Sequence, residues 1–139
     1  MLRLARLRHP NVRFHHADIC SWLLPRRYNF ISAFDSIWHV PLSQHRDVLM
    51  KLMGGLSPGG VIVFTTGGSE GPGEVRDEAM GVPMYHSTLG VRSTLDAIYD
   101  SGCILRHFEY DQFPEGHVYV IAQRPNQSPA TVFTQQGQS

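Results

Sequence analysis

Two kinds of apolar spacing divide the sequence into elements. Short runs that are apolar throughout, or at every second residue, predict strands. Such runs cover residues 12–18, 28–34, 61–65, 103–110 and 117–123. The runs at 28–34 and 61–65 are apolar on both faces, which is typical of buried strands in a sheet covered by helices on both sides. The last two runs are joined by a short link, so we expect them to pair antiparallel.

Apolar residues at helical spacing predict three helices around these strands. They cover residues 2–8, 44–54 and 93–101. Ser43 can cap the second helix, and Gly102 can end the third in a left-handed conformation. Residues 56–60 are expected to form a turn. Residues 67–83, rich in glycine and acids, are expected to form one long surface loop, either a lid over a substrate or a flexible linker.

Strands and helices alternate from residue 11 to residue 102. This order predicts an α/β fold with a mainly parallel sheet and a C-terminal antiparallel strand pair. We place the domain at residues 1–124 and expect a disordered polar tail at residues 125–139. Sheets of this type bind ligands beyond the carboxyl ends of their strands, where residues 18–19 and 34–36 fall.

Composition and charge narrow the range of functions. The 139 residues include 12 basic and 12 acidic side chains, so the overall charge provides no attraction for nucleic acid or an anionic membrane. No apolar run reaches the roughly 20 residues of a membrane helix. Cys20 and Cys103 have no metal or redox spacing, which favours a reducing cytoplasm. We therefore expect a cytoplasmic protein with a small-molecule substrate; its oligomeric state stays open.

Three strings in the sequence resemble the class I S-adenosylmethionine-dependent methyltransferases. Residues 17–19, followed by Trp22, look like the adenine-binding segment after the third strand of that family. Residues 28–40 look like its fourth strand and the loop beside the transferred methyl group, and residues 56–65 look like its fifth strand with the preceding turn. The resemblance covers residues 2–124 and implies a partial Rossmann-like methyltransferase sheet with S-adenosyl-L-methionine as cofactor.

The beginning of the chain departs from this family. The glycine-rich loop and the ribose-binding acid of the family have no counterpart, and residues 1–27 contain no glycine. We therefore expect an N-terminally truncated methyltransferase that by itself binds the cofactor weakly or not at all. Two alternatives stay open. The chain could be a non-catalytic binding module or remnant, or a nicotinamide-binding domain, although the latter needs a glycine-rich loop too.

The resemblance also implies an order of strands. Residues 28–34, 61–65, 117–123 and 103–110 are expected to lie side by side in that order. Residues 11–17 should either pair beside 28–34 or stay unpaired, because the strands that separate these segments in the family have no counterpart.

The resemblance implies a cofactor site at Asp18, Ile19, Phe34 and Asp35. Asp18 would accept a hydrogen bond from the adenine amino group and the Ile19 amide would donate one to a ring nitrogen; otherwise Asp18 caps a helix after a strand. Phe34 would pack on the cofactor. Asp35 would reach the amino group of the cofactor or the substrate; otherwise it caps a turn at the end of a strand. His39 is the first candidate for a catalytic base, with Asp35 as the second catalytic residue; the alternative for His39 is a solvent-facing loop histidine.

Other histidines receive more ordinary interpretations. His86, after the long loop, is a second candidate base. His15 and His16 are neighbours in a predicted strand and would point to opposite faces, so we expect no metal site. His107 and His117 are expected to form local hydrogen bonds in the terminal strand pair.

Overall fold

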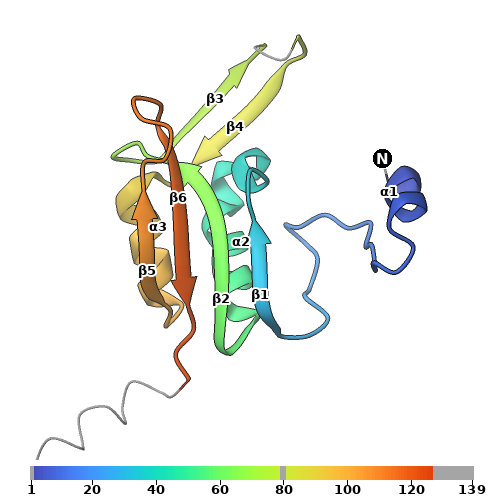
Figure 1. The fold of residues 1–139 in the computed structure, drawn as a ribbon. Coiled ribbons are helices and arrows are strands. Elements are labelled where there is room, and N and C mark those ends of the chain that lie inside the picture. The colour runs from blue at the N-terminus through green and yellow to red at the C-terminus, as the bar shows by residue number, and fades with distance from the viewer. Residues whose placement is uncertain (1, 79–80, 127–139) are drawn as a thin grey trace, which may run out of the picture.

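The computed structural model describes residues 2–78 and 81–126. Its helices and strands follow in the order α1 (Leu2–Arg8), β1 (Tyr28–Ala33), η1 (Ile37–His39), α2 (Leu42–Gly54), β2 (Leu56–Gly67), β3 (Gly73–Asp77), β4 (Met84–Thr88), α3 (Gly90–Asp100), β5 (Ile104–Glu109) and β6 (His117–Gln123) (Figure 1). Most of the tail expected at 125–139 lies outside the described residues. In the described part of the chain, no helix is both long enough and apolar enough to cross a membrane.

Four strands form one sheet in the order β1-β2-β6-β5 (Figure 1). β1 and β2 pair in parallel, whereas β6 is antiparallel to both β2 and β5. β1, β2 and β5 therefore run in the same direction, and β6 runs against them. The predicted α/β class, the strand order and the terminal antiparallel pair are all confirmed.

The core lies between this sheet and helices α2 and α3. Both helices pack on the same face of the sheet (Figure 1), where Leu49 and Ile98 are fully buried together with Ile62 and Phe64 of β2. Along β6, buried residues alternate with partly exposed ones. The expectation that residues 61–65 are covered on both faces is therefore wrong, because no described helix covers the opposite face and Val63 stays partly exposed there.

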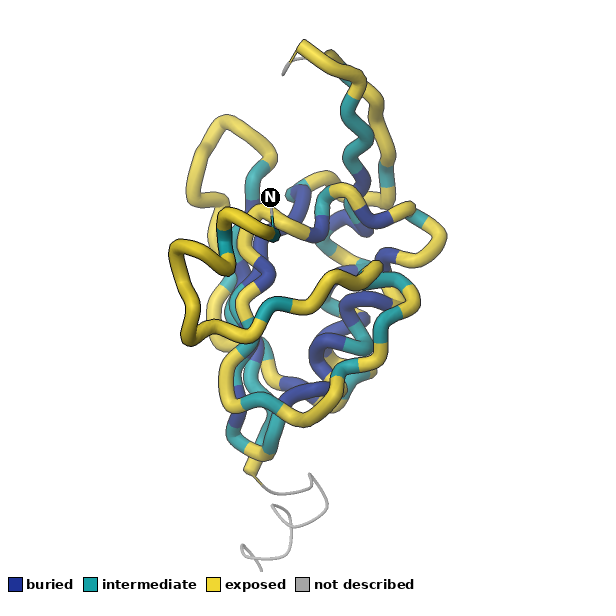
Figure 2. The backbone as a smooth tube through the Cα atoms, turned by 90° about the vertical axis from the view of Figure 1, so that its right-hand side faces the viewer, coloured by how far each residue is buried: buried dark blue, intermediate teal, exposed yellow. Residues whose placement is uncertain are grey.

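The strand predicted at 12–18 is absent. Residues 9–27 form turns and irregular backbone, which is largely exposed (Figure 2). Alternating apolar residues are insufficient for a strand when no neighbouring strand accepts its hydrogen bonds. For the same reason, the prediction that residues 28–34 are buried is wrong. β1 is the outermost strand of the sheet, and Phe30 is 59% exposed.

Residues 67–83 are not one continuous loop. β3 pairs antiparallel with β4, from Gly73 opposite Thr88 to Asp77 opposite Met84. We call this two-stranded sheet the ribbon; it projects from the carboxyl end of the main sheet (Figure 1). β3 was missed because its glycine and acids are typical of loops.

Three boundary predictions have mixed outcomes. The segment 56–60, expected to turn, belongs to β2. α2 begins at Leu42 after Pro41 at its N-cap, so Ser43 lies inside the helix and does not cap it. Gly102 follows α3 with φ +75°, which confirms its left-handed conformation.

Candidate functional site

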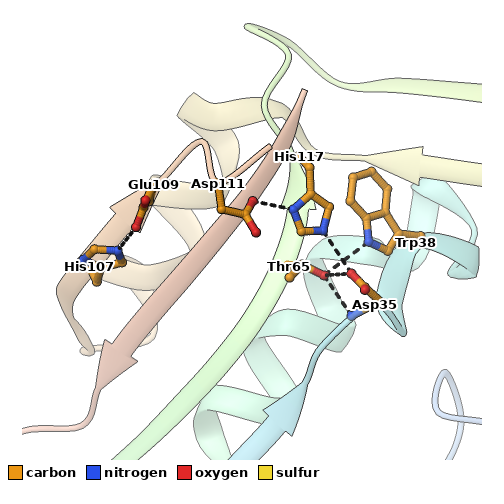
Figure 3. A network of polar contacts seen from close by, with 7 residues as sticks. All are labelled: Asp35, Trp38, Thr65, His107, Glu109, Asp111 and His117. Atoms are coloured by element: carbon orange, nitrogen blue, oxygen red, sulfur yellow. Dashed lines mark hydrogen bonds and ion pairs between the residues drawn. The ribbon is translucent and has the colours of Figure 1, made fainter. Parts of the chain in front are cut away.

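The carboxyl end of the sheet brings together polar residues from three strands. Asp35 follows β1, Thr65 lies near the end of β2, and His117 begins β6 (Figure 3). Because β6 runs in the opposite direction, its first residue lies at the same end of the sheet as the last residues of β1 and β2.

A chain of hydrogen bonds connects these residues (Figure 3). The amide of Asp35 donates to Thr65 Oγ1 over 2.9 Å, and Thr65 Oγ1 donates to Asp35 Oδ1 over 2.9 Å. His117 Nε2 donates to Asp35 Oδ1 over 3.0 Å, while His117 Nδ1 donates to Asp111 Oδ1 over 2.5 Å. Trp38 stacks on His117 with ring centroids 5.8 Å apart, and its indole N–H donates to Thr65 Oγ1.

Two carboxylates bind the ring of His117, whose side chain is 13% exposed. Burial lowers the pKa of His117, but its hydrogen bonds to Asp111 and Asp35 outweigh burial and raise the pKa above its ordinary value. The hydrogen bond from His117 is the main reason that the pKa of Asp35 is lowered. Both ring nitrogens thus face a carboxylate, an arrangement that favours the imidazolium form.

This network holds Asp35 in an unusual backbone conformation. Asp35 has φ 44°, a left-handed value that is uncommon for residues other than glycine. Thr65 bonds both its amide and its carboxylate, and thereby stabilises this conformation. Asp35 lies in the turn after β1, but the partners of its carboxylate are Thr65 and His117 and not an amide of that turn, and sequence reasoning missed both bonds.

A first pocket lies beside the loop that follows β1. We call it the His39 pocket; its volume is about 240 Å³. It is lined by Asp18, Ile19, Cys20, Ser36, His39, Val40, Pro41 and Gln44. The structure therefore brings together three of the residues predicted from the sequence, Asp18, Ile19 and His39, but Phe34 and Asp35 do not line this pocket.

The segment that carries Asp18 is fixed by local and long-range contacts. Asp18 Oδ1 accepts a hydrogen bond from the Cys20 amide over 2.9 Å and so stabilises a turn. The alternative expected for Asp18, a helix cap after a strand, is wrong, because residues 9–27 contain neither a helix nor a strand. The ammonium group of Lys51 on α2 donates to the carbonyl oxygens of Ile19 and Cys20. These contacts tie the irregular segment to the core although it contains no strand.

His39 is bound from the ribbon. Its Nδ1 lies 2.7 Å from the carbonyl oxygen of Tyr85 and therefore donates to it. In the neutral imidazole, Nε2 is then the acceptor nitrogen. The ring of His39 lies 5.0 Å from that of His86.

A second pocket opens where the ribbon meets η1. We call it the ribbon pocket; its volume is about 280 Å³. It is lined by Trp38, Ser69, Gly73, Glu74, Val75, His86, Ser87 and Thr88. Four of these eight residues fall in the segment expected to be a loop, and His86 is the one member of the set that the sequence showed as a candidate.

The remaining candidate residues lie elsewhere. Phe34 is partly exposed and packs on Tyr119, with ring centroids 5.9 Å apart. His15 lies against Trp22 instead of in a strand, so the argument from opposite strand faces does not apply to it. Among the described residues, no group of three or more His, Cys, Asp or Glu side chains is arranged to hold a metal ion. His107 pairs with Glu109, as expected for a local bond (Figure 3).

Comparison with solved structures identifies the fold. A methyltransferase that depends on S-adenosylmethionine, from Mesorhizobium loti, matches 89% of this chain and 76% of its own, with 21% identity and a TM-score of 0.68. A putative enzyme of the same kind from Listeria monocytogenes matches 89% of this chain and 75% of its own, with 12% identity and a TM-score of 0.71. CalS10, an amino pentose methyltransferase from Micromonospora echinaspora, matches 88% of this chain and 69% of its own, with 15% identity and a TM-score of 0.60.

Sequence comparison adds no closer relationship. No protein-family model matches the chain, and no curated protein matches it. The structural matches are nevertheless consistent in the share of this chain that they cover and in the kind of protein that they match. The chain has the fold of the class I S-adenosylmethionine-dependent methyltransferases.

Proposed function

We propose that the chain takes part in methyl transfer from S-adenosylmethionine to a small molecule, with the adenine of the cofactor in the His39 pocket. The observation that carries this proposal is that Asp18, Ile19 and His39 line a single pocket beside the loop after β1. In open α/β sheets, ligands bind at the carboxyl ends of the strands. The similarity to methyltransferase structures supports the choice of cofactor.

The residues of the His39 pocket fit a purine base. A volume of about 240 Å³ lies just below the usual range for sites that enclose a whole ligand, so the pocket suits part of the cofactor. The bond from the Cys20 amide uses one acceptor position of the Asp18 carboxylate, which has about four such positions. Asp18 therefore retains the capacity to accept from an amino group, while Ile19 and Val40 provide apolar walls.

When bound, S-adenosylmethionine supplies a methyl group on a positively charged sulfur. The chain would contribute alignment of the acceptor, since an ordered geometry is the largest requirement of such a transfer. Asp35 and His117 would hold the loop between β1 and α2, and we assign Asp35 a positioning role. His39 and His86, whose rings adjoin, would receive the proton of the acceptor.

Weak cofactor binding by this chain is expected, because the sequence contains no glycine before Gly54 and so provides no counterpart, ahead of β1, of the glycine-rich loop of the family. A dissociation constant near 1 mM corresponds to about 4 kcal/mol of binding free energy. Two-dimensional NMR of the 15N-labelled chain detects binding in this range. Addition of S-adenosylhomocysteine should shift the amide signals of residues 18–20 and 36–40 and leave those of β5 unchanged.

Substitutions at two aspartates sharpen this test. Asp18→Ala should weaken binding about three- to tenfold, since a lost hydrogen bond costs roughly 0.5–1.5 kcal/mol. Asp47→Ala is the matched control, because Asp47 is exposed on α2 and does not line the pocket. Shifts that map to another surface, or equal affinities of the two variants, would contradict the proposed site. Stronger shifts with NADH than with S-adenosylhomocysteine would favour a nicotinamide-binding domain.

A further inference from the structure

One face of the ribbon forms a wall of the ribbon pocket. Gly73 lies opposite Thr88, and Val75 lies opposite His86. Since side chains alternate between the faces of a strand, these four positions share one face. All four line the ribbon pocket, and Trp38 closes it from the side of the main sheet. Position 73 is a glycine where an added Cβ would have no atom within 4 Å, which keeps this part of the pocket open.

Most polar groups of the ribbon pocket are already bonded within the chain. The hydroxyl groups of Ser69, Ser87 and Thr88 donate to the carbonyl oxygens of Gly71, Val40 and Gly67, respectively. The carboxylate of Glu74 accepts a hydrogen bond from the phenol of Tyr85. The pocket therefore presents mainly carbon surface. Its groups with capacity for a ligand are the imidazole of His86 and the carboxylate of Glu74, which has further acceptor positions.

His86 has the geometry of an oriented base. Its Nε2 lies 3.6 Å from Asp77 Oδ2, on the same face of the ribbon. A carboxylate beside one ring nitrogen favours a proton on that nitrogen and leaves the other nitrogen as the acceptor. The centroid of its ring also lies 5.0 Å from that of His39, which lines the His39 pocket. His86 thus lies where the two pockets adjoin.

We propose that the ribbon pocket binds the methyl acceptor, that this acceptor is a flat, largely apolar molecule with a single hydroxyl or ring N–H group, and that His86 takes its proton. The proposal rests on the proposed function and names the substrate class of that site. A pocket of about 280 Å³ fits one or two fused rings, because sites for drug-sized ligands begin near 300 Å³.

The reaction balances with these groups. The oxygen or nitrogen of the acceptor forms a bond to the methyl carbon while the bond from that carbon to sulfur breaks. Sulfur keeps the electron pair of the broken bond and becomes a neutral thioether. The proton of the acceptor passes to His86, which later releases it to water.

Binding of 2-naphthol measured by calorimetry tests the pocket without the cofactor. We expect wild-type protein to bind 2-naphthol, and to bind methyl glucoside, a polar molecule of similar size, at least about tenfold more weakly. Gly73→Leu fills the open space and should weaken naphthol binding about tenfold or more. Gly71→Leu is the matched control, because position 71 also has no atom within 4 Å of an added Cβ and does not line the pocket.

The absorbance of bound 2-naphthol tests the role of His86, since the naphtholate absorbs at longer wavelength than the neutral phenol. In wild-type protein, bound naphthol should ionise at lower pH than free naphthol. In His86→Gln it should ionise like free naphthol while its affinity changes less than about threefold. Equal binding by the two leucine variants, or no binding of naphthol, would overturn the pocket assignment. Identical ionisation in wild type and His86→Gln would overturn the assignment of the base.

A failure of this substrate assignment can be distinguished from a failure of the proposed function. Naphthol binding does not involve S-adenosylhomocysteine, and the NMR shifts at residues 18–20 do not involve naphthol. A chain that bound the cofactor but not naphthol would contradict only the substrate class. A chain that bound naphthol but no cofactor would contradict the proposed function and, with it, the identification of naphthol as a model of a methyl acceptor.

Discussion

His117 is bonded to two carboxylates that differ greatly in their distance from it along the chain. Asp111 is six residues away, and the bond between them could be predicted from proximity within the strand pair. Asp35 is 82 residues away, and no local pattern relates it to His117. That bond depends on the order of strands, because β1 and β6 flank β2 and their ends therefore meet across Thr65.

Among the candidate cofactor residues, too, some positions could be predicted from the sequence and others could not. The strings around Asp18 and His39 were recognisable in the sequence, and the His39 pocket contains both. Asp35 was recognisable as well, but its hydrogen bonds turn it towards His117 and Thr65. The ribbon pocket could not be predicted, since its walls come from a segment without a clear strand pattern.

His117→Gln should make stability depend on pH in a way that identifies the imidazolium. The raised pKa of His117 means that its contribution is fully present below the unfolded value of about 6.5 and is lost as the pH rises through the folded pKa. The variant should therefore lose about 1–2 kcal/mol at pH 5.5 and clearly less at pH 8.5. Urea unfolding of both proteins at the two pH values measures this difference.

Two comparisons show whether the pH dependence comes from His117. His107→Gln makes the same change in an exposed pair on β5 and should have little effect at either pH. His45 titrates in the opposite sense, because burial lowers its pKa and its contribution is lost as the pH falls below about 6.5. Since His45 is present in every variant, its effect cancels in the differences. A larger loss at pH 8.5 than at pH 5.5 would show that His117 is not held as an imidazolium.

Elements with strong periodicity were predicted well, whereas those that depend on a partner were not. α2, α3, β5 and β6 appear within a few residues of their predicted positions because each has an apolar face that the core buries. The segment 12–18 has the alternation of a strand and no neighbour with which to pair. β3 and β4 pair with each other, although the glycine and acids of β3 obscure its alternation.

The root of the ribbon is closely packed, which predicts a large effect of a small substitution. A Cβ at Gly67 would lie 2.7 Å from Thr88 Cβ, so Gly67→Ala must displace β4. We expect a loss of about 1–3 kcal/mol in the free energy of unfolding. Gly54→Ala is the control: no atom lies within 4 Å of its added Cβ, and alanine at a helical position should be neutral or gain up to about 1 kcal/mol. Urea unfolding of both variants checks the prediction, and equal stabilities would contradict it.

The fold taken together was predictable because the strand order followed from a recognisable family resemblance. The resemblance did not predict how much the burial of the helices and strands differs. β2 is paired on both sides and packed under α2 and α3, whereas α1 contains no buried residue. Stability should therefore be concentrated in the centre of the sheet.

Hydrogen exchange measured by mass spectrometry or NMR should reveal that gradient. The amides of residues 61–65 should exchange most slowly, since they open only when the sheet separates from its helices. Those of residues 2–17 should be among the fastest, because this segment has few contacts with the core. Similar protection of the two segments would show that residues 2–17 are ordered by contacts absent from this structure.

The outer edge of β1 has one further consequence, which concerns how copies of the chain meet. In the described part of the chain, no strand pairs with this edge, and Phe30 is exposed on it. An open edge is a template, because its free N–H and C=O groups can extend a sheet into another molecule. Such an encounter obeys mass action, so its frequency rises with the square of the concentration. Dilute and concentrated solutions of this protein should accordingly be treated as different samples until their particle sizes have been compared.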